Sequence, residues 1–321
     1  MVILTTSATL ASLLLVGWFA RRRGLLGGES SRELARFVVD VAFPALVVYQ
    51  LPRTVDAATL SDRWYVPILG AGVLCAGLAV GTLLAPWSTA IDRRPTFAFL
   101  VGTPNWLFLP LPIAGALYGD DGVQSVLLAN VGAQVTMWTL GVWTLRKGQV
   151  GATSLRELVL NPGLLATLVG SALAIGAPHL PEGTSSAHAL APLIEALGLL
   201  AGLTVPLSLI VTGAQLAELD PDTSGHAREQ SGILLGRLLL TPLVLFALLH
   251  VTLLALHAQV HSVPLRVALL IAAMPVAVSC GPMTARYGGP AGMSARAVLY
   301  TTVVGLLTAP AVLWLLATEV G

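Results

Sequence analysis

Two apolar segments of the chain contain polar and helix-breaking residues that could bind a solute within a membrane. Residues 99–112 contain three prolines within nine positions, Pro104, Pro110 and Pro112. Residues 274–282 contain a second group of this kind, Pro275, Ser279, Gly281 and Pro282. A proline inside a helix removes a backbone donor and clashes with the preceding turn. Both segments are therefore predicted to be interrupted helices.

The interruptions predict a site for an anion. The second half-helices are expected to start near Leu111 and near Gly281, with a proline in the first turn, where it is well tolerated. The free N–H groups and the positive dipole end of each half-helix then favour a negative charge. Two such ends could bind a carboxylate without a buried cationic side chain. The alternative is a pair of proline kinks that serve only packing.

Other polar residues in the apolar segments are further candidates. Asn105 could donate to a carboxylate or cap the backbone, while Thr103 and Ser279 could cap half-helices or contact the solute. Asn130 and Gln134 are four positions apart, so they share one helix face, either for solute contact or for interhelical hydrogen bonds.

Charged residues in apolar segments suggest function because they are costly in lipid. Asp40 is the candidate for a carboxylate that couples transport to protons. Glu195 and Arg237 are further charges of this kind, and the alternative for both is that the side chain simply extends toward the lipid headgroups. The sequence shows no Cys or His cluster for a metal and no reactive pair for intramembrane catalysis, so we predict no catalytic residue, no cofactor and no enzyme activity.

The composition places these segments in a lipid bilayer. Apolar residues make up 55% of the 321 positions and charged residues only 10%, against about a quarter charged in a soluble domain. Net charge is +1, which gives no basic surface for nucleic acid. The apolar run at 2–20 precedes Arg21, Arg22 and Arg23, an order typical of a first span rather than a cleaved leader.

Apolar runs of about 20 residues predict ten transmembrane helices. They lie at 2–20, 32–51, 64–86, 95–118, 122–145, 161–177, 189–215, 232–257, 264–286 and 291–317. With both termini outside, only Arg53, Arg63 and Arg266 of the 17 Lys and Arg residues fall on the outer side. The positive-inside rule thus predicts a multi-pass protein of the cytoplasmic membrane with both termini outside.

Matching features indicate an internal repeat. Pro44 and Pro206 lie in the second and seventh predicted spans, and Tyr118 and Tyr287 each precede a glycine at the end of the fourth and ninth. We expect a five-helix repeat at 1–145, a short cytoplasmic linker at 146–160 and a second repeat at 161–321. An odd number of spans inverts the second repeat, as in many secondary transporters. The alternative is chance similarity between apolar sequences.

These residues together resemble the auxin efflux carrier family, of the superfamily that includes bile-acid symporters. The similar segments are Phe43–Leu46, the region of Asn105, Asn161–Thr167, Val205–Leu209, Thr212–Leu216 and Met274–Gly288. The resemblance implies a scaffold of spans 1, 2, 6 and 7 that forms a homodimer, and a mobile unit of spans 3–5 and 8–10. It also implies that the fourth and ninth spans cross at their breaks, near Pro104 or Pro110 and Pro275, with Asn105 facing the carboxylate.

The resemblance implies transport of small organic anions such as auxin, malate or malonate. Plant members have an acidic residue on the third span, which is absent here, so the resemblance does not imply proton coupling by that route. The leading hypothesis is a secondary active or facilitative carrier with elevator-type alternating access. The alternative is a membrane sensor that binds a ligand without moving it.

Overall fold

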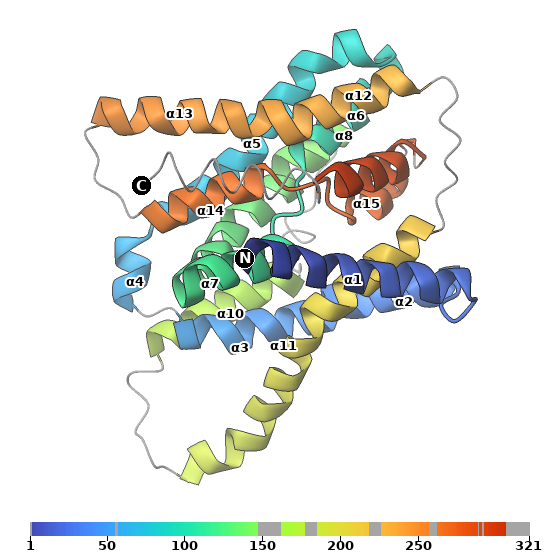
Figure 1. Ribbon diagram of the computed structural model, residues 1–321. Helices are drawn as coiled ribbons and strands as arrows, with labels where there is room; N and C mark the ends of the chain where they lie inside the picture. Colours follow the sequence, from blue (N-terminus) through green and yellow to red (C-terminus); the bar gives the residue numbers. More distant parts are fainter. Residues whose placement is uncertain are drawn as a thin grey trace. The chain divides into compact units, whose positions relative to one another are not determined.

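The structure is a computed structural model that describes residues 2–54, 57–146, 162–176, 185–217, 226–256, 262–287, 289–290 and 292–305 (Figure 1). Within these ranges the regular elements are helices, and the only β-type pairing is a single isolated bridge. The predicted linker at 146–160 lies outside the described residues, apart from Arg146.

Five described segments are long and apolar enough to cross a membrane. They are Gly28–Arg53, Val66–Ser88, Pro110–Leu145, Ala191–Ala217 and Ala227–Ala255, and two shorter apolar helices cover Leu165–Gly176 and Ser262–Ala272. The expectation of an all-helical, multi-pass membrane protein is thereby confirmed. Many large apolar side chains on these helices are exposed, among them Leu199 and Leu254, as a lipid-facing surface requires.

The chain divides into two compact units. Unit 1 comprises Met1–Ala11, Val66–Thr153 and Glu218–Gly321, and unit 2 comprises Ser12–Tyr65 and Ser154–Ala217. The helices of unit 2 are most of α1 (Val2–Arg22), α2 (Gly28–Phe37), the π-helix η1 (Val38–Ala42), α3 (Phe43–Thr54), α4 (Ala57–Asp62), α10 (Pro162–Gly176) and α11 (Ser185–Ala217). Helix α3 packs against both α10 and α11 (Figure 1).

Close backbone contacts and a wide turn shape unit 2. A Cβ atom at Gly213 would lie 1.9 Å from the carbonyl oxygen of Leu14, so α11 and α1 touch through their backbones. The wide turn η1 ends just before Pro44, which has no N–H to continue the hydrogen-bond pattern of a regular helix. The hydroxyl of Thr204 donates to the carbonyl oxygen of Ala42 at 2.8 Å and so satisfies part of this turn.

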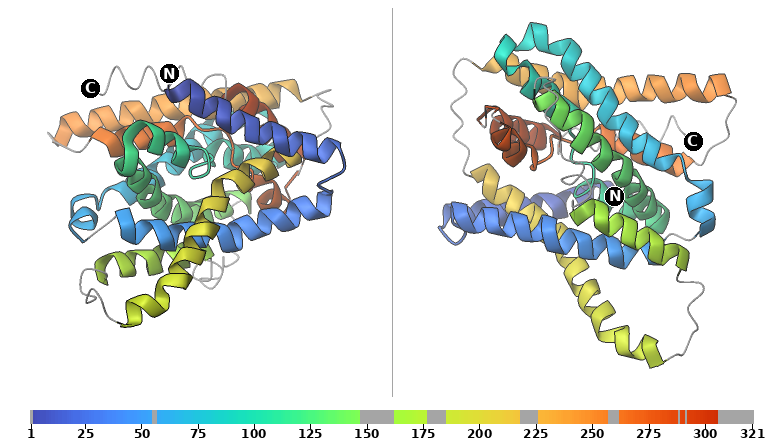
Figure 2. Two further views of the ribbon diagram at one scale, coloured as in Figure 1. Left: turned by 60° about the horizontal axis from the view of Figure 1, so that its bottom comes forward. Right: turned by 180° about the vertical axis from the view of Figure 1, so that it is seen from behind.

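Unit 1 contains the two interrupted helices. Its elements are α5 (Val66–Ser88), η2 (Ile91–Arg93), α6 (Arg94–Gly102), α7 (Pro110–Thr136), η3 (Met137–Gly141), α8 (Val142–Leu145), α12 (Ala227–Leu234), η5 (Leu235–Leu240), α13 (Thr241–Leu256), α14 (Ser262–Ala272), α15 (Cys280–Arg286) and the helical residues 292–305. Helix α5 runs beside α7, as both orientations show (Figure 2).

Helix α7 consists of two helical runs that fold back on each other at Gly119. This residue has φ 58° and ψ −142°, a conformation that glycine adopts readily and other residues avoid. A Cβ atom at Gly122 would lie only 2.3 Å from the carbonyl oxygen of Ala114, eight positions earlier. A straight helix would separate two such residues by about 12 Å, so the chain reverses here.

The short helices that precede the two breaks are buried in unit 1. In α6 the residues from Thr96 to Gly102 are buried, and in α14 those from Pro264 to Ala272 are buried except Arg266, which is half-buried. Non-helical backbone within a membrane is tolerated only where protein or a water-filled cavity surrounds it. The burial of α6 and α14 therefore places the breaks that follow them inside the protein.

Candidate functional site

The two breaks lie against each other and pair through their backbones. Pro104 and Val276 form the isolated antiparallel bridge. The N–H of Asn105 donates to the carbonyl oxygen of Pro275 at 2.7 Å, and the N–H of Ala277 donates to that of Thr103 at 3.1 Å. Where each helix ends, its backbone groups lose their partners within the helix. Each break thus supplies hydrogen-bond partners to the backbone groups of the other. We call this paired backbone, residues 103–105 and 275–277, the crossing.

A third segment supports the crossing from residues 292–305. The N–H of Val276 donates to the hydroxyl oxygen of Thr301 at 3.0 Å, and that hydroxyl donates to the carbonyl oxygen of Ala297 at 2.7 Å. Because Thr301 is fully buried, this bond replaces one that water cannot supply. The ninth predicted span is therefore held at its break by the tenth.

A single arginine joins the helix ends that enter the crossing. Arg237 of η5 donates from Nη1 to the carbonyl oxygen of Val101 at 2.6 Å and from Nη2 to that of Ala272. These carbonyls belong to the last turns of α6 and α14. Arg237 has no exposed surface, so the alternative that its side chain extends toward the headgroups is wrong. A Cβ atom at Gly77 would lie 3.0 Å from Nη1, so a glycine there leaves room for the guanidinium.

The amide groups at the start of α7 are already used within the chain. The N–H of Leu111 donates to the carbonyl oxygen of Leu107 at 2.9 Å, and that of Phe108 donates to Oδ1 of Asn105 at 3.0 Å. Pro110 and Pro112, in the first turn, have no N–H to offer. The start of α7 therefore has fewer available amide donors than the sequence alone indicated.

Helix α15 begins in the same way. The N–H groups of Cys280 and Gly281 donate to the carbonyl oxygens of Ala277 and Val278, at 3.0 and 3.3 Å. Pro282, inside this helix, contributes no N–H. An anion at the crossing would consequently depend on side-chain donors as well as on the helix dipoles.

Two asparagines present side-chain donors near the crossing. Oδ1 of Asn105 accepts the Phe108 bond, which leaves its Nδ2 hydrogens to donate. Oδ1 of Asn130 accepts from Nε1 of Trp106 at 3.0 Å. Because the indole N–H only donates, this bond fixes the orientation of the Asn130 amide. Nδ2 of Asn130 is buried and has no partner in the part of the chain described here, so it can donate to a bound acceptor.

The remaining predicted site residues differ in whether they contact the crossing. The backbone of Thr103 is part of the crossing. Gln134 is mostly buried one turn after Asn130, and no hydrogen bond between described residues joins its side chain to the crossing. Ser279 is exposed just before α15, and Asp40 is exposed in η1 of unit 2. The structure thus brings Thr103 and Asn105 together, with Asn130 attached through Trp106.

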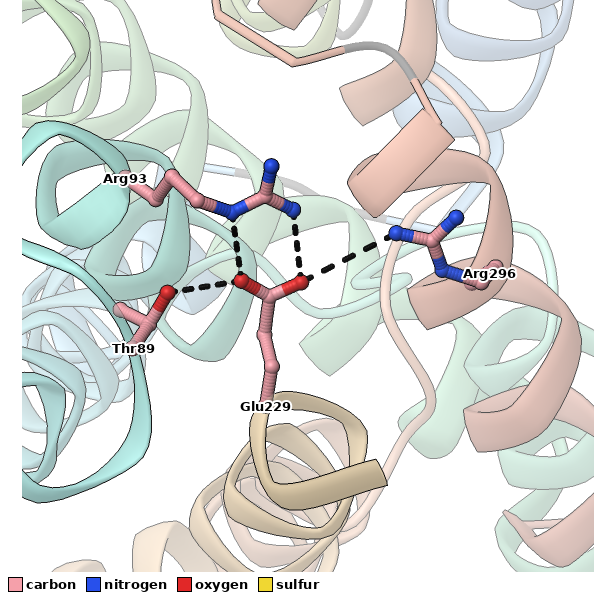
Figure 3. A network of polar contacts seen from close by, with 4 residues as sticks. All are labelled: Thr89, Arg93, Glu229 and Arg296. Carbon is pink, nitrogen blue, oxygen red and sulfur yellow. Dashed lines mark hydrogen bonds and ion pairs between the residues drawn. The ribbon is translucent and has the colours of Figure 1, made fainter. Parts of the chain in front are cut away.

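A second polar cluster in unit 1 was not predicted from the sequence (Figure 3). Glu229 of α12 accepts two hydrogen bonds from Arg93, at 2.7 and 2.8 Å, and one from the hydroxyl of Thr89 at 2.7 Å. Nη2 of Arg296 lies 3.9 Å from Oε1 of Glu229. The bond to Glu229 raises the pKa of Arg93 above its usual value. The cluster joins the start of α6, α12 and residues 292–305.

Comparison with known proteins agrees with this architecture. The profile of a family described as membrane transport protein matches residues 2–313. An uncharacterized transporter of Methanothermobacter thermautotrophicus is 26% identical over 308 residues, which are 94% of this chain and 94% of the relative. An uncharacterized transporter of Methanocaldococcus jannaschii is 23% identical over 212 residues, 64% of this chain and 66% of the relative. The chain therefore belongs to the membrane transport protein family, the family of the auxin efflux carriers, as its motifs indicated.

Proposed function

We propose that this protein is a secondary active or facilitative carrier that moves a small organic carboxylate across the cytoplasmic membrane. The observation that carries the proposal is the set of amide donors at the crossing. Nδ2 of Asn130 has no hydrogen-bond partner among the described residues, although Asn130 is almost completely buried. Asn105 uses its Oδ1 to accept from Phe108, which leaves its Nδ2 able to donate. An unsatisfied buried donor costs about 1–3 kcal/mol. A carboxylate would remove that penalty, whereas a cation would add to it.

The proposed mechanism is elevator-type alternating access, in which unit 1 moves and unit 2 is the scaffold. The crossing, Arg237, Asn130 and Thr301 all belong to unit 1. A unit that contains the whole site can carry the solute without rebuilding it during the movement. We further propose ten membrane crossings in two inverted repeats, both termini outside, and a homodimer formed through unit 2.

The position of Asp40 bears on coupling. Asp40 belongs to unit 2 and is exposed, whereas the residues of the crossing belong to unit 1. A proton-coupling carboxylate is expected where its charge is linked to solute binding. We therefore propose that any coupling through Asp40 acts on the scaffold rather than on solute binding.

Transport by the purified protein in proteoliposomes tests the proposal. Counterflow of labelled dicarboxylates and aryl acetates should show saturable uptake of at least one anion. Two substitutions separate the roles of Asn105. Asn105→Ala removes both its donor and the cap on Phe108, while Asn105→Asp keeps an acceptor for Phe108 but replaces the donor with a negative charge.

Both variants should weaken anion uptake by about 10- to 100-fold, because a hydrogen bond to a charged group contributes about 1.5–3 kcal/mol. Thermal unfolding reports the cap separately, because Asn105→Asp keeps the acceptor for Phe108 that Asn105→Ala removes. Thr139→Ala is the matched control, since this exposed hydroxyl bonds only to its own helix. Absence of saturable flux for every anion with the wild-type protein would reject the proposed function, and saturable ligand binding without flux would favour a sensor.

A further inference from the structure

We propose that the guanidinium of Arg237 takes the place of a coupling cation at the crossing, so that this carrier works without sodium. The proposal rests on the proposed function for its consequence in transport. The assignment of the site itself rests only on the contacts of Arg237.

Helices α6 and α14 both end at Arg237 with their C-terminal carbonyl groups. Val101 is the second-last residue of α6 and Ala272 is the last residue of α14, and both carbonyls accept from Arg237. The C-terminus of a helix carries about half an elementary negative charge. Two such ends on one group therefore supply about one negative charge in total, which matches one guanidinium.

Helix dipoles, rather than a carboxylate, compensate the charge of Arg237. Arg237 is completely buried, and its guanidinium forms no ion pair with an acidic side chain among the described residues. Its Nε has no hydrogen-bond partner there either. A buried cation without a partner would be very costly. The carbonyl oxygens of Val101 and Ala272 are thus the groups that stabilise the buried charge of Arg237.

Two helix C-termini that meet at one point form the kind of site that binds a cation in transporters. Unwound carbonyls and the C-terminal ends of broken helices are the groups that coordinate sodium in secondary carriers. Here a side chain occupies that position and cannot leave. The planar guanidinium also reaches two carbonyls at once, which an ammonium group matches poorly. The consequences are a fixed positive charge near the anion, no ion released in each cycle, and α6 and α14 held together throughout.

The wild-type protein allows a first test that needs no substitution. The melting temperature in detergent is measured in sodium, potassium and choline chloride at one ionic strength. We expect equal values in the three salts. A saturable stabilisation by sodium alone would overturn the proposal, because it would show an exchangeable cation site.

Chemical rescue gives the second test. Arg237→Ala should lower the melting temperature by about 5 °C or more, and guanidinium at about 10 mM, far below denaturing concentrations, should restore part of it. Arg237→Lys should be intermediate and unaffected by guanidinium. The matched control is Arg228→Ala, since Arg228 is an exposed arginine on α12, and it should show neither loss nor rescue.

The outcomes separate this inference from the proposed function. An Arg237→Ala protein as stable as the wild type, or a destabilised one that guanidinium does not rescue, would overturn the assignment. Should Arg237→Ala fail to fold, Arg237→Lys and the salt comparison on the wild type decide. Rescue without flux of any anion rejects the proposed function and retains the cation site, while sodium-dependent flux by the wild type rejects the inference and retains the carrier.

Discussion

The contact between α5 and α7 gives the sharpest prediction for the site. A Cβ atom at Gly70 would lie 1.9 Å from the carbonyl oxygen of Ala129, and one at Gly132 would lie 1.7 Å from that of Pro67. The two helices therefore meet backbone to backbone, in the way that small residues permit in membranes. Asn130 lies between these two contacts on α7, so the donor arrangement of the crossing depends on their closeness.

The size of the effect of Gly70→Ala follows from these distances. Ordinary contact with a Cβ begins at 3.4 Å, so α5 and α7 would have to separate locally by about 1.5 Å. A shift of that size lengthens the 3.0 Å bond between Trp106 and Asn130 beyond hydrogen-bond range. Overpacking of this kind costs about 1–3 kcal/mol, and backbone atoms cannot move aside as a flexible side chain can. We expect the upper end of that range.

Gly72→Ala is the matched control, because Gly72 lies in the same helix and its Cβ would meet nothing within 4 Å. Replacing that glycine should stabilise α5 by about 0.5–1 kcal/mol. The two variants should then differ in melting temperature by about 5 °C in detergent. Gly70→Ala should also lose anion uptake, and Gly72→Ala should keep it. Equal melting temperatures and equal uptake for the two variants would refute the reasoning.

Two further predictions concern other parts of the fold. Glu229→Gln removes the charge that accepts both bonds from Arg93. Because Arg93 is partly exposed to solvent, we expect the free energy of unfolding to fall by about 1–3 kcal/mol, measured as a lower melting temperature. An unchanged melting temperature would mean that the cluster does not contribute to stability. Gly213→Ala forces a Cβ against the carbonyl of Leu14 and should destabilise unit 2, whereas Gly202→Ala in the same helix, with open space around it, should not; thermal unfolding of both variants decides.

The interruptions could be predicted from the sequence because their cause is local. A proline ends a helix wherever its ring and missing N–H fall, so Pro104, Pro110 and Pro275 indicate broken helices without knowledge of any neighbour. The apolar runs are local in the same sense, since their length follows from the thickness of the bilayer. The all-helical membrane architecture and the family both followed from features of this kind.

The polar contacts at the site could not be predicted because they join distant parts of the chain. Arg237 and Val101 are 136 positions apart, and Arg93 and Glu229 are also 136 apart. The sequence pattern of an arginine one or two turns into an apolar helix does not depend on what its side chain contacts. The pattern is the same whether the guanidinium extends to the headgroups or donates to the carbonyls of two helix C-termini. The amide donors at the start of α7 were overestimated for a related reason, since the side chain of Asn105 accepts one of them.

These contacts change the electrostatic basis of the site. The sequence alone suggested that helix N-termini would bind the anion without a cationic side chain. In the structure a fixed guanidinium neutralises the opposite ends of the helices that precede the breaks. Because those negative ends would otherwise repel an anion at the crossing, their neutralisation raises the local potential by the equivalent of about one elementary charge. An anion site at this crossing therefore needs Arg237 as well as the two breaks, even if the solute never touches its side chain.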